Sequence, residues 1–310
     1  MFIFDFSLYS LKAELNGSSP VRQVARMAKK QLAVAIPASV IADTPHLREK
    51  TSKIGFFGRA AAIFRVDEII VYADNPQTNQ NLDIDLIATL LSYMETPQYL
   101  RKHLFGLKSE LQFAGILPPL RTPHHPLQGR IRDLKRGDYR EGVAVSQARE
   151  GVFVDIGVEK PARLPHTHAI TGKRLTVKIT RITDQVEVQI AERNEISEYW
   201  GYTVSLERHS LCKLLEKGEY DLTIATSKFA TRFKDAAQRL EQRWSEANHK
   251  LVLFGAPTRG LHEIAKDEGA NLNDLADFVL NTVPGQGTET VRTEEALLAT
   301  LAVLNAQFDT

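Results

Sequence analysis

The sequence has little cysteine and no long apolar run, and each absence excludes a class of protein. Cys212 is the only cysteine among 310 residues, so no internal disulfide framework can form and no cysteine cluster can hold zinc. No apolar run is long enough to cross a membrane. The opening segment 1–6 is apolar but short, contains an acid and lacks a basic start, so we expect a buried strand rather than a signal peptide. A cytoplasmic protein fits these features.

The chain also lacks a strong net charge. It has 39 Lys and Arg against 38 Asp and Glu, a formal charge of +1, so an overall basic field cannot attract nucleic acid. A local cluster would have to do so, and one lies in a proline-interrupted connection. Its cations either bind RNA phosphates or form a solvated linker. They are Arg121, Arg130, Arg132, Lys135, Arg136 and Arg140. The adjacent His124 and His125 have no further ligands nearby in sequence, so we expect no metal.

Three apolar runs each end in a loop of small residues. Segment 280–296 passes from an apolar run through Gly285 and Gly287 directly into a helical pattern. Segment 251–254 is followed by a second loop at 255–261, and segment 221–224 by a third at 225–227. Glycine allows backbone conformations closed to other residues, and a helix start offers unpaired amide donors. Such loops at the carboxyl ends of parallel strands predict a pocket for a nucleotide-like cofactor.

The hydrophobic period changes twice along the chain. Strand and helix patterns alternate in the first part, short β-rich runs follow, and the helical period returns after about residue 196. We therefore expect an α/β domain in two parts, 1–121 and 196–310, with a small all-β barrel inserted at 122–195. The predicted strands of the first part are 31–36 and 68–72, and its helices are 45–64 and 84–94. Those of the barrel are 142–147, 151–157, 174–180 and 186–190.

Segment 151–157 looks like the central strand of an OB-fold barrel, a class that grips single strands of nucleic acid. The candidate stacking residues are few, with Phe153 and Tyr139 the main ones. The insert therefore either binds RNA or is purely structural.

The three loops resemble those of the SPOUT superfamily of S-adenosylmethionine-dependent RNA methyltransferases. Segment 254–261 corresponds to the second motif of that superfamily and segment 280–296 to the third. Segment 55–66, followed by the strand 68–72, resembles the first motif of the ribose-methylating branch. Two positions depart, because Lys53 stands where that branch has asparagine and Arg65 where it has glycine. The resemblance implies an α/β fold with a trefoil knot, which is rare in proteins generally.

Three longer segments resemble a subgroup of archaeal and eukaryotic RNA methyltransferases with an inserted OB-like domain. They are 93–101, 117–126 and 199–202. Eukaryotic members of this subgroup are linked to methylation of the uridine ring nitrogen in ribosomal RNA. With these segments the resemblance covers nearly all of the chain after about residue 31.

The resemblance also implies site residues. Arg59 occupies the first-motif arginine position, which engages the substrate in the superfamily, although an arginine on a helix surface would explain it too. Glu289 and Arg292 lie in the third motif, which faces cofactor and substrate. Thr290 either contacts the cofactor or caps the following helix, while Glu294 and Glu295 suit the helix start itself. The remaining expected cofactor contacts, mostly through the main chain, are Thr226, Leu253, Phe254, Gly255, Gly260, Leu280, Asn281, Pro284, Gly285 and Gln286.

The sequence thus predicts an S-adenosylmethionine-dependent RNA methyltransferase acting on a uridine ring nitrogen in ribosomal RNA. The cofactor supplies a reactive methyl group, so the protein has to align the nucleophile and handle one proton. The superfamily implies a homodimer with the cofactor site near the subunit interface. Three alternatives stay open: ribose 2′-O-methylation, a non-catalytic RNA-binding assembly factor, and a protein that binds another nucleotide, although the phosphate-cradling lysine motif is absent.

Overall fold

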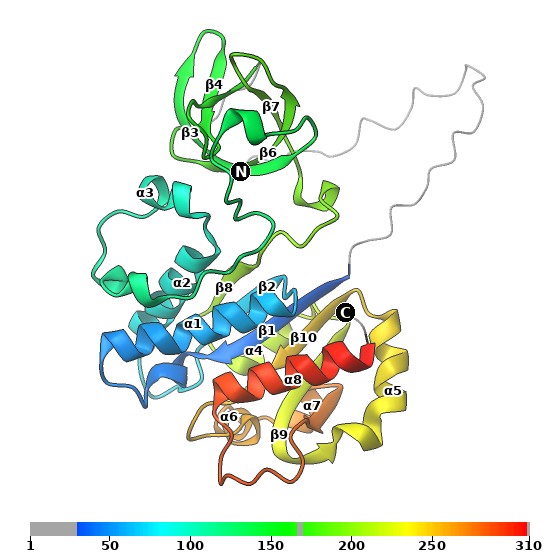
Figure 1. Ribbon diagram of the computed structural model, residues 1–310. Coiled ribbons are helices and arrows are strands. Elements are labelled where there is room, and N and C mark those ends of the chain that lie inside the picture. Colours follow the sequence, from blue (N-terminus) through cyan, green and yellow to red (C-terminus); the bar gives the residue numbers. More distant parts are fainter. Residues whose placement is uncertain (1–29, 166–169, 309–310) are drawn as a thin grey trace, which may run out of the picture.

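The computed structural model describes residues 30–165 and 170–308, which form a parallel sheet covered by helices and a separate small β-barrel (Figure 1). The expected strand at 1–6 lies outside the described residues. The sheet has six strands in the order β11-β9-β10-β1-β2-β8, and every pairing is parallel. These strands are β1 (Gln31–Pro37), β2 (Glu68–Tyr72), β8 (Thr203–Glu207), β9 (Leu222–Arg232), β10 (His249–Leu253) and β11 (Phe278–Asn281).

Side chains of β1 alternate between two cores, one on each face of the sheet. Leu32, Val34 and Ile36 pack into one core, and Ala33 and Ala35 pack into the other. The first face is covered by α1 (Leu47–Ile63), α2 (Asn81–Glu95), α5 (Phe233–Glu246) and α8 (Thr293–Phe308). The second is covered by the shorter α4 (Leu211–Glu216), α6 (Leu261–Asp267) and α7 (Leu272–Leu275).

The barrel closes in the order β3-β4-β5-β7-β6 around its own core, which includes Val152, Val154, Val177 and Val188. Figure 1 shows it standing apart from the helices of the sheet, beyond the short α3 (Arg101–Leu104). Its strands are β3 (Tyr139–Ala148), β4 (Gly151–Asp155), β5 (Ala162–Leu164), β6 (Arg174–Arg181) and β7 (Glu187–Ile190). All of them lie within the predicted insert 122–195, whose outer boundaries stay a prediction.

Two expectations about the sheet were wrong. The loop expected at 225–227 is absent, because β9 continues to Arg232. The pairing of β11 instead jumps from Ala225 to Thr231, so the intervening residues bulge out of the ladder at the expected place. The return of a helical period after residue 196 overlooked β8, a five-residue strand at the edge of the sheet beside β2. The other predicted strands and helices are confirmed to within a few residues.

Candidate functional site

A cavity of about 480 Å³ lies between the bulge of β9 and the loops that follow β10 and β11. Parallel strands bring the loops that follow them to one edge of the sheet, so these three segments converge although they are distant in sequence. The structure brings together most of the predicted cofactor residues here. Those that line the cavity are Thr226, Phe254, Gly255, Gly260, Leu280, Asn281, Gln286 and Thr290.

The other predicted cofactor residues, Leu253, Pro284 and Gly285, do not line the cavity. Leu253 is fully buried in β10, and its carbonyl accepts a hydrogen bond of 2.9 Å from Thr226 Oγ1. Gly285 is exposed with φ of +72°, and a Cβ added to it would meet no atom within 4 Å. Gly285 is therefore needed for the turn itself, and its predicted contact with the cofactor stays a prediction.

The loop after β10 is held from several sides. The phenol of Tyr72 donates a 2.7 Å hydrogen bond to the Phe254 carbonyl, and Thr293 Oγ1 donates one of 3.0 Å to the Gly255 carbonyl. Burial raises the pKa of Tyr72 well above its ordinary value, so this phenol stays protonated as a donor. A Cβ on Gly255 would approach Leu261 N to 3.1 Å, so the loop leaves little room there.

The loop after β11 is held by two side-chain amides. Asn281 Nδ2 donates to the Lys228 carbonyl at 2.8 Å, and its Oδ1 accepts from Val283 N at 3.0 Å. Gln286 Nε2 donates to the carbonyls of Thr288 and Glu289 at 2.9 and 3.1 Å. These bonds link the bulge of β9 to the third loop and fix the wall of the cavity that both form.

The polar residues around the start of α8 make different contacts. The helix begins at Thr293, and Glu295 Oε2 accepts from Arg292 N at 2.9 Å, as an acid in the first turn can. Glu294 lies 3.8 Å from Lys53 of α1. Thr290 precedes the helix by three residues and lines the cavity, so it does not cap the helix.

Arg259 also lines the cavity and was missed by the sequence analysis. Its guanidinium donates to the Asp74 carbonyl at 2.7 Å and pairs with the Asp74 and Asp267 carboxylates at 3.3 and 2.8 Å. Asp74 is fully buried and also accepts from Ser39 Oγ at 2.6 Å. The only indication of this contact in the sequence was Asp74 itself, a carboxylate two residues after β2 and so at the same edge of the sheet.

The three predicted catalytic residues are not all in one place. Glu289 and Arg292 are exposed and flank two residues that line the cavity. Arg59 does not line it; its guanidinium donates to the carbonyls of Pro119 (3.3 Å) and Leu120. Within one chain, Arg59 therefore holds the proline-interrupted segment against α1.

The predicted RNA-binding cations differ in exposure. Arg140 is buried and donates to the Gln128 carbonyl at 3.1 Å, which removes it from the surface that RNA could touch. The others are exposed: Arg121, Arg130, Arg132, Lys135 and Arg136.

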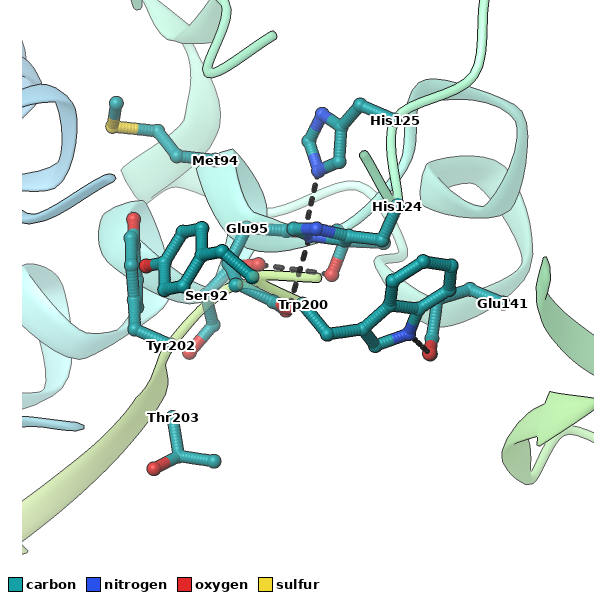
Figure 2. A network of polar contacts seen from close by, with 12 residues as sticks. Ser92, Met94, Glu95, His124, His125, Glu141, Trp200, Tyr202 and Thr203 are labelled. Carbon is teal, nitrogen blue, oxygen red and sulfur yellow. Dashed lines mark hydrogen bonds and ion pairs between the residues drawn. The ribbon is translucent and has the colours of Figure 1, made fainter. Parts of the chain in front are cut away.

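A second polar cluster joins the barrel to the sheet (Figure 2). Arg174 of β6 lies 2.6 Å from Glu95 of α2 and 2.6 Å from Glu141 of β3, and Trp200 Nε1 donates to Glu141 at 2.6 Å. Both carboxylates are buried. Burial raises the pKa of Glu95, but the His124 hydrogen bond and the Arg174 charge outweigh it and leave this pKa below its ordinary value.

His124 and His125 belong to this junction. Their Nε2 atoms donate to the Glu95 carbonyl at 2.9 and 2.7 Å, and His124 also lies 3.2 Å from the Glu95 carboxylate.

Over residues 30–165 and 170–308, no group of three or more His, Cys, Asp or Glu side chains is arranged to hold a metal ion. No helix in that same part of the chain is long and apolar enough to cross a membrane.

Comparisons with known proteins match this sequence over most of its length. Residues 31–304 match the model of a family described as "Putative RNA methyltransferase". The human 28S rRNA (uridine-N(3))-methyltransferase is 35% identical over 306 residues, covering 88% of this chain and 77% of the relative. The Drosophila melanogaster protein of the same name is 32% identical over 88% of this chain, which spans 61% of that relative. An uncharacterised protein of Halobacterium salinarum is 32% identical, with 87% of this chain and 97% of the relative covered.

Proposed function

The chain belongs to the RNA methyltransferase family whose model it matches, and from this premise we propose that it methylates N3 of a uridine in ribosomal RNA with S-adenosylmethionine as the methyl donor. The carrying observation is the cavity formed by the bulge of β9 and the loops that follow β10 and β11. The human and Drosophila melanogaster relatives, which are named for uridine N3 methylation, each match over 88% of this chain, and this share supports the same reaction here. The proposal includes the knotted SPOUT fold and an OB-like barrel.

The cavity fits S-adenosylmethionine in size and chemistry. Its volume of about 480 Å³ lies in the range of small-molecule pockets, and its walls combine apolar side chains with loop backbone. Bound there, the cofactor would supply an electrophilic methyl group. Val283 and Val291, which line the cavity and are partly exposed, would offer apolar side chains, and the loop backbone around Gly255 and Gly260 would offer main-chain groups.

The protein's own task is to orient the uridine and manage the proton on its ring nitrogen. We assign the exposed Arg292 to stabilising the anion that forms when that proton leaves, since its guanidinium is always charged. The Glu289 carboxylate, three residues away on the same loop, is the candidate base. Arg59 would engage the RNA substrate after releasing the carbonyls that it now contacts.

A homodimer is part of the proposal. Helices α1 and α8 lie side by side (Figure 1) and expose apolar side chains that a second copy would cover. Phe56 and Ile63 of α1 are 65% and 51% exposed, and Leu298 of α8 is 47% exposed. Arg59 lies on the same helix as the first two, so pairing through this face would bring an Arg59 to the subunit interface.

The exposed cations before the barrel support RNA binding. Five of them lie between the sheet and β3, where they would contact phosphates without selecting a sequence. On the barrel, Tyr139 and Phe153 are half-buried, and Lys178 lies 5.1 Å from the Tyr139 ring. These are the candidate stacking positions for an unpaired base.

The testing experiment has two steps. Calorimetric titration with S-adenosylmethionine, with ATP as control ligand, should show selective binding. Incubation of unmodified ribosomal RNA with radiolabelled cofactor should then place the label on N3 of a uridine. A label on the ribose would redirect the proposal to 2′-O-methylation, and selective binding of RNA without any transfer would favour an assembly factor.

A further inference from the structure

A second cavity, of about 620 Å³, lies at the opposite edge of the sheet from the cofactor cavity. It opens where β1 and β10 begin, between the end of α1, the last turn of α5 and the end of α8. Nothing in the proposed methyl transfer uses it. Its walls are aromatic and its rim is basic, the combination that recognises an unpaired nucleotide.

The aromatic wall is formed by rings from four segments of the chain. The rings of Trp244 and Phe308 stack with centroids 5.0 Å apart and planes inclined by 23°. Phe64, at the end of α1, and Tyr199 complete the wall. Every base has a flat face that such rings can stack against, whatever its identity.

Three cations line this cavity. Arg65 and Lys30 are exposed, and Lys250 is buried against Trp244 with its ammonium 5.1 Å from the ring. Lys30 Nζ donates to the Ser245 carbonyl at 2.7 Å, and Lys250 Nζ to the Ala247 carbonyl at 2.9 Å. In the described part of the chain, the Arg65 guanidinium has no hydrogen bond or ion pair. Two acids, Asp67 and Glu241, also line the cavity.

The backbone conformation of Arg65 is a second observation that supports a binding role, and it is independent of the side chains that line the cavity. Its φ is +56°, a left-handed conformation that side chains other than glycine rarely adopt. It follows the cap of α1: Val66 N donates to the Ala61 carbonyl and Arg65 N to the Ala62 carbonyl. This pattern is a helix-ending motif in which glycine normally occupies the left-handed position. A charged, strained residue here implies that the guanidinium is used, because strain of this kind clusters at binding sites.

We propose that this cavity is a second RNA-binding site, which takes one unpaired nucleotide with its base on the aromatic wall and its phosphate on Arg65 and Lys30. The inference rests on the proposed function, because it assumes that RNA is the substrate. It would anchor the substrate RNA at the edge of the sheet away from the methyl donor.

The test compares Arg65→Gly with the unmodified protein. Glycine adopts the left-handed conformation freely, so the variant should melt at the same temperature or higher. Its affinity for a fluorescent single-stranded 20-nucleotide RNA should nevertheless fall roughly tenfold. Loss of one phosphate contact should also reduce the slope of log affinity against log salt by about 0.7. S-adenosylmethionine affinity should not change.

Two further variants distinguish a specific RNA-binding site from non-specific attraction of RNA by basic side chains. Arg48, exposed at the other end of α1, has no hydrogen bond or ion pair in the described part of the chain, so Arg48→Ala should keep the affinity and the slope. Arg65→Lys keeps the charge and should retain most of the affinity. Equal losses in Arg48→Ala and Arg65→Gly, or unchanged RNA affinity in Arg65→Gly, would overturn the inference while leaving the methyltransferase proposal intact. Absence of RNA binding by the unmodified protein would overturn both.

Cross-linking locates the nucleotide directly. RNA containing 4-thiouridine should cross-link to peptides that carry Phe64 or Trp244. Cross-links confined to the barrel and the cofactor loops would contradict the second site.

Discussion

The loop after β11, beside the cofactor cavity, and the barrel junction both carry charged groups, but they use those groups in opposite ways. At the cavity, the side chains of Glu289 and Arg292 are exposed and have no hydrogen bond or ion pair within the described residues. At the junction, Arg174 pairs with both Glu95 and Glu141, and both carboxylates are buried. The first region keeps charge available for a substrate, whereas the second uses charge to hold two parts of the chain together. Substitutions should therefore affect binding in one region and stability in the other.

The largest effect is expected from Arg174→Met. It leaves Glu95 and Glu141 buried without their shared cation, so the free energy of unfolding should fall by about 4 kcal/mol. Urea denaturation measures this, and S-adenosylmethionine affinity of the folded variant should be unchanged. Lys213→Ala is the control, since its pair with Glu216 is exposed to solvent and its loss should leave the free energy of unfolding nearly unchanged. A loss of under 1 kcal/mol for Arg174→Met would contradict the stabilising role.

Acid should weaken the junction before it affects the cavity. Burial, and then the charge of His124, lower the pKa of His125 from 6.5 to about 4. Between these values the unfolded chain binds more protons than the folded one, so stability is complete above pH 6.5 and is lost as pH falls to 4. The loss is on the order of 3 kcal/mol. Urea denaturation at pH 7 and pH 4.5 should show this loss in the free energy of unfolding, and His125→Gln should abolish most of the loss. An unchanged pH dependence in that variant would mean that groups other than His125 cause it.

Two glycine substitutions compare the regions directly. Gly201 and Gly285 have φ of +80° and +72°, so alanine strains the backbone equally at both. At Gly201 the added Cβ would lie 2.5 Å from His124 Cε1 and 2.7 Å from Glu95 Oε1, whereas at Gly285 it would meet nothing within 4 Å. Gly201→Ala should destabilise by about 2 kcal/mol and Gly285→Ala by about 1 kcal/mol. Only Gly285→Ala should weaken cofactor binding, because its backbone strain falls in the loop after β11 that forms a wall of the cavity. Equal melting temperatures for the two variants would contradict the steric argument.

The smallest effect is expected from Thr293→Val, which removes the hydrogen bond between the start of α8 and the Gly255 carbonyl. Stability should fall by about 1 kcal/mol and S-adenosylmethionine affinity by a few-fold, because the loop after β10 loses one support. Thr288→Val serves as a matched control, since the exposed Thr288 side chain makes no hydrogen bond in the described part of the chain. Calorimetry on both variants makes the comparison, and equal affinities would count against the proposed role of Thr293.

The sequence predicted the elements that are defined by local pattern. Apolar runs placed β1, β2, β10 and β11, and small residues placed the loops that meet at the cavity. Contacts between distant residues could not be predicted in the same way. Arg259 contacts Asp74, 185 positions away, and Arg174 contacts Glu95, 79 positions away. Neither pair can therefore be predicted from a pattern of neighbouring residues. Arg140 looked like its exposed neighbours in the linker because burial depends on how the barrel packs.

The position of β1 at the centre of the sheet has a consequence for how the chain folds during synthesis. The barrel pairs strands that are close in sequence, so it can fold as soon as residue 190 has left the ribosome. By contrast β1 pairs with β10, with Gln31 opposite His249, and must wait for the last third of the chain. During that interval the edge of β1 that will pair with β10 has no strand partner, so its backbone is open to wrong strand pairing.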